Sequence, residues 1–185
     1  ILTGNSNTKL DDNRVTGVGQ PCTTVIDNQV YLFHTDWDSG LDAIHVARAP
    51  LEDITNPSAW KKYKDGSFSS AGLGGASDAV VVPSFEGDDY AASCSVSWNS
   101  YLSQYLMSYE TRNAIYTVRS NDGIDWTDPK LLLSFSQFGN AKVGYASLVS
   151  PTAEMGQTNQ SGIVILSIRA AGTLDTMMAI PFVFS

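Results

Sequence analysis

The sequence predicts an all-β protein that forms part of a β-propeller, with about three four-stranded antiparallel blades visible. Helical patterns are scarce, whereas short runs rich in Val, Ile, Tyr, Phe and Thr alternate with clusters of Gly, Asn, Asp, Pro and Ser. A pattern of strands and turns also occurs twice in full and a third time in part, with a spacing of roughly seventy residues. Repeats of about this size indicate a modular β architecture.

The elements of the first copy are GVGQPCTTVIDNQVYLFHTDW, AIHVARAP and SAWKKY, and the second copy reads YAASCSVSWNSYLSQYLMSYE, AIYTVRSNDGIDW and KLLLSF. The alignment of the copies pairs Asp36 with Glu110, Ala43-Ile44 with Ala114-Ile115, and Trp60 with Trp126. A short helical turn fits only 51–59, where Pro57 limits its length. The predicted strands are 22–27, 30–36, 43–48, 60–63, 79–85, 90–98, 104–110, 114–119, 130–135, 144–150, 162–169 and 177–184.

Each full copy supplies about four strands, the content of one propeller blade. We predict one domain over 1–185 with blade-like repeats at about 17–67, 76–138 and 141–185. The third repeat lacks an obvious fourth strand, which 1–16 could provide. Three blades are fewer than the four to eight that close a propeller. The chain is therefore part of a larger protein, or assembles with another copy, or contains a further degenerate blade at 68–89. The Gly-rich segment 72–77 is interpreted as a connection between blades.

Composition limits the partners. The 185 residues are 43% hydrophobic, enough for one core, and carry a formal charge of −8. This charge repels phosphate backbones and anionic membranes, so no nucleic acid or membrane is expected as a partner. No apolar run is long enough to span a membrane. Cys22 and Cys94 lie 72 residues apart, in corresponding parts of the two full repeats. They form a disulfide in a secreted protein, or two buried free thiols.

Residues 120–126 read SNDGIDW, which is similar to the S-x-D-G-x-x-W turn of glycosidase propellers and related to the Asp box of sialidases. Asp122 can accept backbone N–H groups, Gly123 can adopt a positive φ, and Trp126 can pack between sheets. These residues are interpreted as structural. With GVGQP, YLFHTDW and SVSWNSYLSQYLMSYE, they make residues 17–135 resemble bacterial glycoside-hydrolase-like five-bladed propellers related to families 43, 32 and 117.

This resemblance implies three carboxylates around a central funnel that act as base, acid and modulator of the acid's pKa. Gln20-Pro21 stands where such enzymes often have Asp-Pro. Because the second strand of a blade returns to the face where the first begins, the ends of these strands should share one rim. We predict Asp36, Asp78 and Glu110 as catalytic residues and Gln20, Trp37, Asp38 and Trp98 as sugar-binding residues. Glu86 and Glu154 are weaker candidates.

Each candidate has a structural alternative. Acids at strand ends are ordinary in an acidic chain, and strand tryptophans often belong to the core. The two histidines, His34 and His45, form no pattern typical of a transition-metal site. No cofactor is expected, although the resemblance leaves room for a calcium ion in the channel.

The leading hypothesis is a secreted or periplasmic glycoside hydrolase that binds a carbohydrate in its funnel. The alternatives are a lectin-like or protein-binding module without catalysis, and a fragment whose missing blades come from another chain or from self-association.

Overall fold

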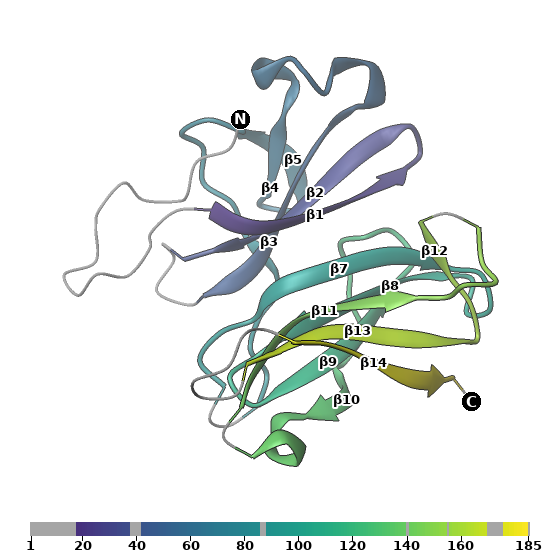
Figure 1. The fold of residues 1–185 in the computed structure, drawn as a ribbon. Helices are drawn as coiled ribbons and strands as arrows, with labels where there is room; N and C mark the ends of the chain where they lie inside the picture. The colour runs from purple at the N-terminus through teal and green to yellow at the C-terminus, as the bar shows by residue number, and fades with distance from the viewer. Residues whose placement is uncertain are drawn as a thin grey trace.

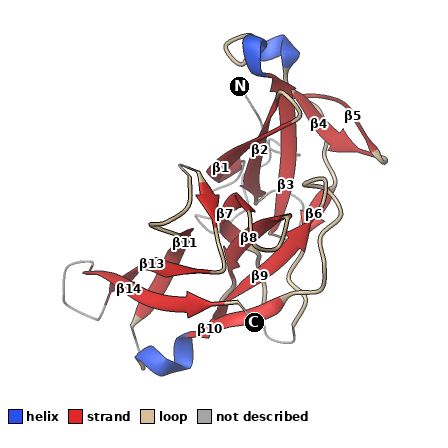
Figure 2. Cartoon of the chain, turned by 90° about the vertical axis from the view of Figure 1, so that its right-hand side faces the viewer, coloured by secondary structure: helices blue, strands red, loops and turns tan. Residues whose placement is uncertain are grey.

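The computed structural model describes residues 18–37, 42–85, 88–139, 141–154, 156–169 and 176–184. The chain is all-β, as predicted, and its strands form three separate sheets (Figure 1). The short helical turns lie outside these sheets (Figure 2). Within the described residues, no helix is both long and apolar enough to cross a membrane.

The first sheet has the order β1-β2-β3-β4-β5, and β6 pairs with β3. Asp27 and Asn28 join β1 to β2, and both have a positive φ, which is the requirement of a tight type I′ hairpin turn. The strands are β1 Val18–Ile26, β2 Gln29–Asp36, β3 Ala43–Pro50, β4 Lys61–Lys64, β5 Ser67–Ala71 and β6 Ala79–Val81.

The second sheet has the order β10-β9-β8-β7-β12. Its first four strands are antiparallel, and the short strand β12 pairs with β7 in parallel at the edge of the sheet. The third sheet has the order β11-β13-β14. These strands are β7 Ala92–Asn99, β8 Gln104–Glu110, β9 Ala114–Ser120, β10 Lys130–Ser134, β11 Lys142–Val149, β12 Gln157–Thr158, β13 Ser161–Arg169 and β14 Thr176–Val183. The described residues thus form three propeller-type sheets. The exact blade boundaries stay predictions, and 1–16 lies outside the described residues.

Two differences from the expected strands have simple causes. The outer hairpin partner β5 was missed because SFSSA is small and polar, and β12 because two residues form no recognisable pattern. The helical turn expected within 51–59 is present as two 3₁₀ turns, η1 Leu51–Asp53 and η2 Pro57–Ala59. A third turn, η3 Phe135–Phe138, was not expected.

Two apolar cores lie between successive sheets. One joins the first and second sheets around Phe33 and Tyr109, both fully buried. The SNDGIDW turn contributes to this core: the ring of Trp126 lies 5.9 Å from that of Phe33 in an edge-on contact. Asp122 accepts N–H bonds from Ile124 and Asp125, so the turn is structural as interpreted. The other core joins the second and third sheets around Leu106, Ile115, Leu148 and Leu166.

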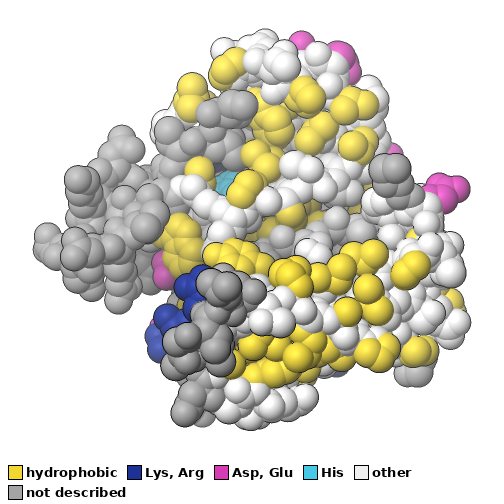
Figure 3. Space-filling model, in the orientation of Figure 1, with side chains coloured by type: hydrophobic (Ala, Val, Ile, Leu, Met, Phe, Trp, Pro, Cys, Tyr) yellow, Lys and Arg dark blue, Asp and Glu magenta, His cyan; other side chains and the backbone are white. Residues whose placement is uncertain are grey.

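The outer face of the third sheet is also apolar. Met177 is 67% and Val183 is 72% exposed, and the register places both on the face opposite the buried core residues Leu166 and Phe182. Figure 3 shows hydrophobic side chains over the lower part of this view, where Figure 1 places β13 and β14. A sheet that is apolar on both faces normally packs between two layers.

The two cysteines join the first two sheets. Cys22 on β1 and Cys94 on β7 place their Sγ atoms 3.1 Å apart, with both thiols free. Contact with Cys22 and burial raise the pKa of the Cys94 thiol. Only a small movement separates this contact from a covalent bond.

We expect mild oxidation to convert this pair to a disulfide with the loss of two hydrogens, detectable by intact mass. The bond would close a loop of about 70 residues and raise the free energy of unfolding by about 4 kcal/mol. Cys94→Ser should show neither change. A wild-type protein that keeps two titratable thiols after oxidation would contradict this prediction.

Candidate functional site

The first strand of each sheet carries the same irregularity. In β1, β7 and β11 one extra residue forms a bulge, and the residue in the bulge has a positive φ although it is not glycine: Gln20 (50°), Ser93 (51°) and Tyr145 (55°). Such a conformation is uncommon for residues with a side chain. Bulges redirect side chains and are over-represented next to functional sites. β7 contacts both β1 and β11, so the three bulges belong to neighbouring inner strands.

The register at these bulges revises the alignment of the repeats. The residue before each bulge pairs with Thr35 in the first sheet, Glu110 in the second and Ser167 in the third. Glu110 therefore corresponds to Thr35. The sequence alignment had paired Glu110 with Asp36, and this pairing was wrong. A shift of one residue moves a side chain to the other face of a strand, so Asp36 and Glu110 do not occupy equivalent positions.

A chain of hydrogen bonds connects the three sheets at this level. Thr35 Oγ1 donates to Gln20 Oε1 over 3.2 Å, and the backbone N–H of Ser93 donates to Thr35 Oγ1 over 3.4 Å. Ser93 Oγ then donates to Glu110 Oε1 over 2.8 Å. The backbone N–H of Tyr145 donates to Glu110 Oε2, also over 2.8 Å. Glu110 is thus fixed by the second and third sheets together.

Glu110 ends β8 and is only 9% exposed. Burial raises the pKa of its carboxyl group, and the hydrogen bonds from Tyr145 and Ser93 oppose this shift without cancelling it. Gly144 leaves the space that the carboxylate occupies, because a Cβ atom at this position would lie 2.6 Å from Glu110 Oε2. The result is a carboxyl group that is held in place by two neighbouring strands and has a raised pKa.

One cavity opens at this carboxyl group, and a second, larger cavity adjoins it. The smaller, of about 240 Å³, is lined by Glu110, Lys142, Val143, Gly144, Tyr145, Ser167 and Arg169. The larger, of about 640 Å³, shares Lys142 and Val143 and adds Tyr90, Arg112, Asn113, Ser134, Phe135, Ser136, Gly139 and Ala141. Glu110 is the one carboxylate among these lining residues. The volumes suit a small organic ligand.

Asp36 lies elsewhere. It is fully buried at the end of β2, and strand alternation places it on the same face as His34 and His45, away from Thr35. Burial lowers the pKa of His34 to about 3 and also lowers that of His45, an effect that Asp36 opposes. Lys62, also buried, donates to the carbonyl of Gly75. Asp36 thus belongs to a buried polar cluster in the first sheet and lines neither cavity.

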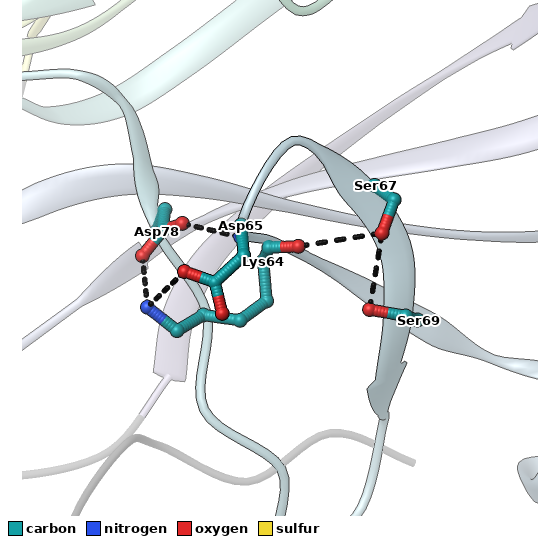
Figure 4. A network of polar contacts seen from close by, with 5 residues as sticks. All are labelled: Lys64, Asp65, Ser67, Ser69 and Asp78. Carbon is teal, nitrogen blue, oxygen red and sulfur yellow. Dashed lines mark hydrogen bonds and ion pairs between the residues drawn. The ribbon is translucent and has the colours of Figure 1, made fainter.

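Asp78 supports the outer hairpin of the first sheet (Figure 4). Its Oδ1 lies 2.6 Å from Lys64 Nζ, and its Oδ2 accepts the backbone N–H of Asp65 over 2.7 Å. The hydrogen bond from Lys64 is the main cause of the lowered pKa of Asp78. An aspartate held ionised in this way stabilises the β4-β5 turn and does not line the cavities.

The predicted sugar-binding residues separate into two groups. Gln20 and Trp37 lie near the bulge level, and the ring of Trp37 lies 6.3 Å from that of Tyr90 at the larger cavity. Trp98 packs on Tyr105 near the other end of β7, about 16 Å from the bulge residue Ser93 at 3.3 Å per residue. Of the remaining candidates, Asp38 and Glu86 lie outside the described residues. Glu154 is exposed and accepts a hydrogen bond from the side chain of Gln157.

Sequence reasoning missed Thr35, Ser93 and Tyr145, and also the residues that line the cavities around Glu110. One signal was available: the dipeptide Val-Gly precedes the bulge in both β1 and β11, at 18–19 and 143–144. Among the described residues, no group of three or more His, Cys, Asp or Glu side chains is placed to hold a metal ion.

Comparisons with known proteins identify the fold. No family model and no curated protein matches the sequence. The α-L-arabinofuranosidase PaAbf62A from Podospora anserina, solved with cellotriose, matches with a TM-score of 0.53 and 13% identity, over 97% of this chain and 54% of its own. The catalytic domain of a Coprinopsis cinerea GH62 α-L-arabinofuranosidase matches with a TM-score of 0.54 and 11% identity, over 98% of this chain and 56% of its own.

The chain therefore has the fold of glycoside-hydrolase propellers, as the sequence resemblance had indicated. It spans about half the length of these solved structures. At this low identity the likeness concerns the arrangement of the strands, and the site must be argued from the residues of this chain.

Proposed function

We propose that this chain is a carbohydrate-active protein that binds a sugar in the cavities at Glu110 and cleaves a glycosidic bond with Glu110 as proton donor. One observation carries the proposal: a carboxyl group whose pKa is raised by burial opens into a cavity and is held by neighbours from two sheets. A general acid in glycoside hydrolysis needs such a raised pKa in order to be protonated near neutral pH.

The fold supports this assignment. The two solved structures are arabinofuranosidases, and the one from Podospora anserina was solved in complex with cellotriose, so a protein with this arrangement of strands binds carbohydrate. In this chain Trp37 and Tyr90 form an aromatic pair beside the larger cavity, and aromatic faces pack well against sugar rings. These two residues are the proposed sugar platform, with Gln20 nearby.

Hydrolysis requires a second carboxylate on the other side of the scissile bond. Asp78 forms an ion pair with Lys64, and Asp36 lies on the face of β2 opposite Thr35. Neither residue is therefore assigned this role. We propose that the second carboxylate belongs to a further blade. That blade would cover the apolar outer face of the third sheet, which contains Met177 and Val183.

A second candidate function is carbohydrate binding without turnover. It is favoured by the three bulge positions, which carry Gln20, Ser93 and Tyr145 and so provide no carboxylate at the centre. Under this alternative Glu110 acts as a buried hydrogen-bonding group that orders β11.

A panel of chromogenic glycosides, combined with calorimetric binding of neutral and acidic trisaccharides, separates the two functions. Turnover of any glycoside supports hydrolysis, and binding without turnover supports the second candidate. Absence of both would overturn the proposal.

Sedimentation of the same samples tests self-association, because a monomer at high concentration would exclude a second copy as the source of the missing blade. Secretion is proposed together with the Cys22–Cys94 disulfide.

A further inference from the structure

Tyr145 has a backbone conformation that its side chain disfavours. It occupies the bulge of β11 with a φ of 55°. A positive φ is a genuine outlier for a bulky residue, whereas glycine adopts it without strain and is common in bulges. Strained positions of this kind cluster at functional sites. The ring of Tyr145 therefore needs an explanation, because a glycine would form the same bulge at lower cost.

The corresponding residues of the other two bulges use their side chains within their own sheets. Gln20 Oε1 accepts a hydrogen bond from Thr35, and Ser93 Oγ donates one to Glu110. In each case the partner is the residue that pairs with the position just before the bulge. Tyr145 differs, because its phenol makes no hydrogen bond to another described residue and the residue is 65% exposed. Its side chain has no such role inside the sheet.

Tyr145 lines the smaller cavity together with Glu110. It is the one aromatic residue among those that line this cavity, whereas the Trp37–Tyr90 pair lies at the larger cavity. The backbone N–H of Tyr145 donates to Glu110 Oε2 over 2.8 Å, which fixes the residue next to the carboxyl group while most of its surface stays exposed. An aromatic face in this position can pack on the C–H groups of a sugar ring.

We propose that Tyr145 is a sugar-binding residue, whose ring packs on the apolar face of the sugar unit that binds next to Glu110. It adds a second aromatic platform to the one formed by Trp37 and Tyr90, so each of the two cavities has its own. The contact uses C–H groups and requires no charge on the sugar. The inference names a further residue of the proposed site and so rests on the proposed function.

Calorimetry with cellotriose and with the other trisaccharides of the panel tests this role. Tyr145→Ala and Tyr145→Gly should each weaken the binding of a trisaccharide by about two- to tenfold, the usual contribution of one aromatic contact. Tyr145→Phe should bind as the wild type does, because it keeps the ring. Tyr101→Ala is the matched control, since Tyr101 is 47% exposed in the turn between β7 and β8, at the other end of β8 from Glu110.

Thermal unfolding separates the ring from the strained backbone. Glycine relieves the strain at a positive φ that alanine retains, so Tyr145→Gly should unfold about 2–4 °C above Tyr145→Ala. Binding should nevertheless be weakened in both variants, because both lack the ring.

Two results would overturn the inference and leave the proposed function intact. One is equal trisaccharide binding by the wild type, Tyr145→Ala and Tyr145→Gly. The other is binding that is lost in Tyr145→Ala and retained in Tyr145→Gly, because the ring would then be dispensable. No binding of any trisaccharide by the wild type would overturn the inference and the proposed function together.

Discussion

Replacing Glu110 with Gln is expected to lower the turnover of a responsive glycoside by about 10²–10⁴-fold, the usual contribution of a positioned general acid. Binding should change little, because Gln keeps the size of the side chain and its Oε1 can still accept one hydrogen bond from Ser93 or Tyr145. Steady-state kinetics beside calorimetric binding measures the two effects separately. Glu154→Gln, at an exposed position, is the matched control.

The pH dependence provides an independent readout of the same residue. A proton donor is active while protonated, so wild-type turnover should fall as pH rises through the raised pKa of Glu110. Because the folded-state pKa lies above the unfolded value of about 4.3, the carboxyl group stabilises the fold below that value and loses this contribution as pH rises. The free energy of unfolding of the wild type should therefore fall relative to Glu110→Gln over this range. Equal turnover of the two proteins would remove Glu110 from the mechanism.

The second large effect is expected from Gly144→Ala. The added methyl group would lie 2.6 Å from Glu110 Oε2, a contact that forces the buried carboxylate away from the backbone N–H of Tyr145. We expect a loss of about 1–3 kcal/mol in the free energy of unfolding, as in overpacked cores. Turnover should fall together with stability, because the carboxyl group moves. Chemical denaturation and glycoside turnover measure the two effects.

Two features of the chain supply the controls. Gly19 is the corresponding residue in β1, where a Cβ atom would lie 3.5 Å from Trp37 Nε1, so Gly19→Ala should be tolerated. The corresponding residue in β7 is already Ala92. In a Glu110→Ala background, Gly144→Ala should lower the free energy of unfolding only slightly. The double-mutant cycle of these two substitutions should therefore give a coupling energy of about 1 kcal/mol or more between positions 144 and 110. Additive effects in this cycle would show that the methyl group acts through another neighbour.

The fold class could be predicted because it depends on local properties. The short apolar runs between turn-forming residues and the SNDGIDW turn at 120–126 are short-range patterns, and both are found in the structure as strands and as a hydrogen-bonded turn. The equivalence of Ala43-Ile44 with Ala114-Ile115 also agrees with the register, because Ile44 pairs with Thr35 and Ile115 with Glu110.

The candidate site could be predicted only in part. The sequence singled out Glu110, but it aligned this residue with Asp36 because spacing along the chain cannot show a bulge. Asp78 was expected at the mouth because it follows a Gly-rich connection, whereas Lys64 and the backbone of Asp65 hold it at the outer hairpin. Trp98 was expected near the sugar and lies at the far end of its strand.

By itself, the sequence determined which segments become strands, where the turns form, and that one acidic residue would end β8. These properties depend on residues close together in the chain. Only the tertiary structure decided which face each carboxylate occupies and what surrounds it. Glu110 acquires its raised pKa from burial between two sheets, its position from Ser93 and Tyr145, and its space from Gly144. Pairing between distant strands sets these contacts, and a one-residue bulge suffices to change them.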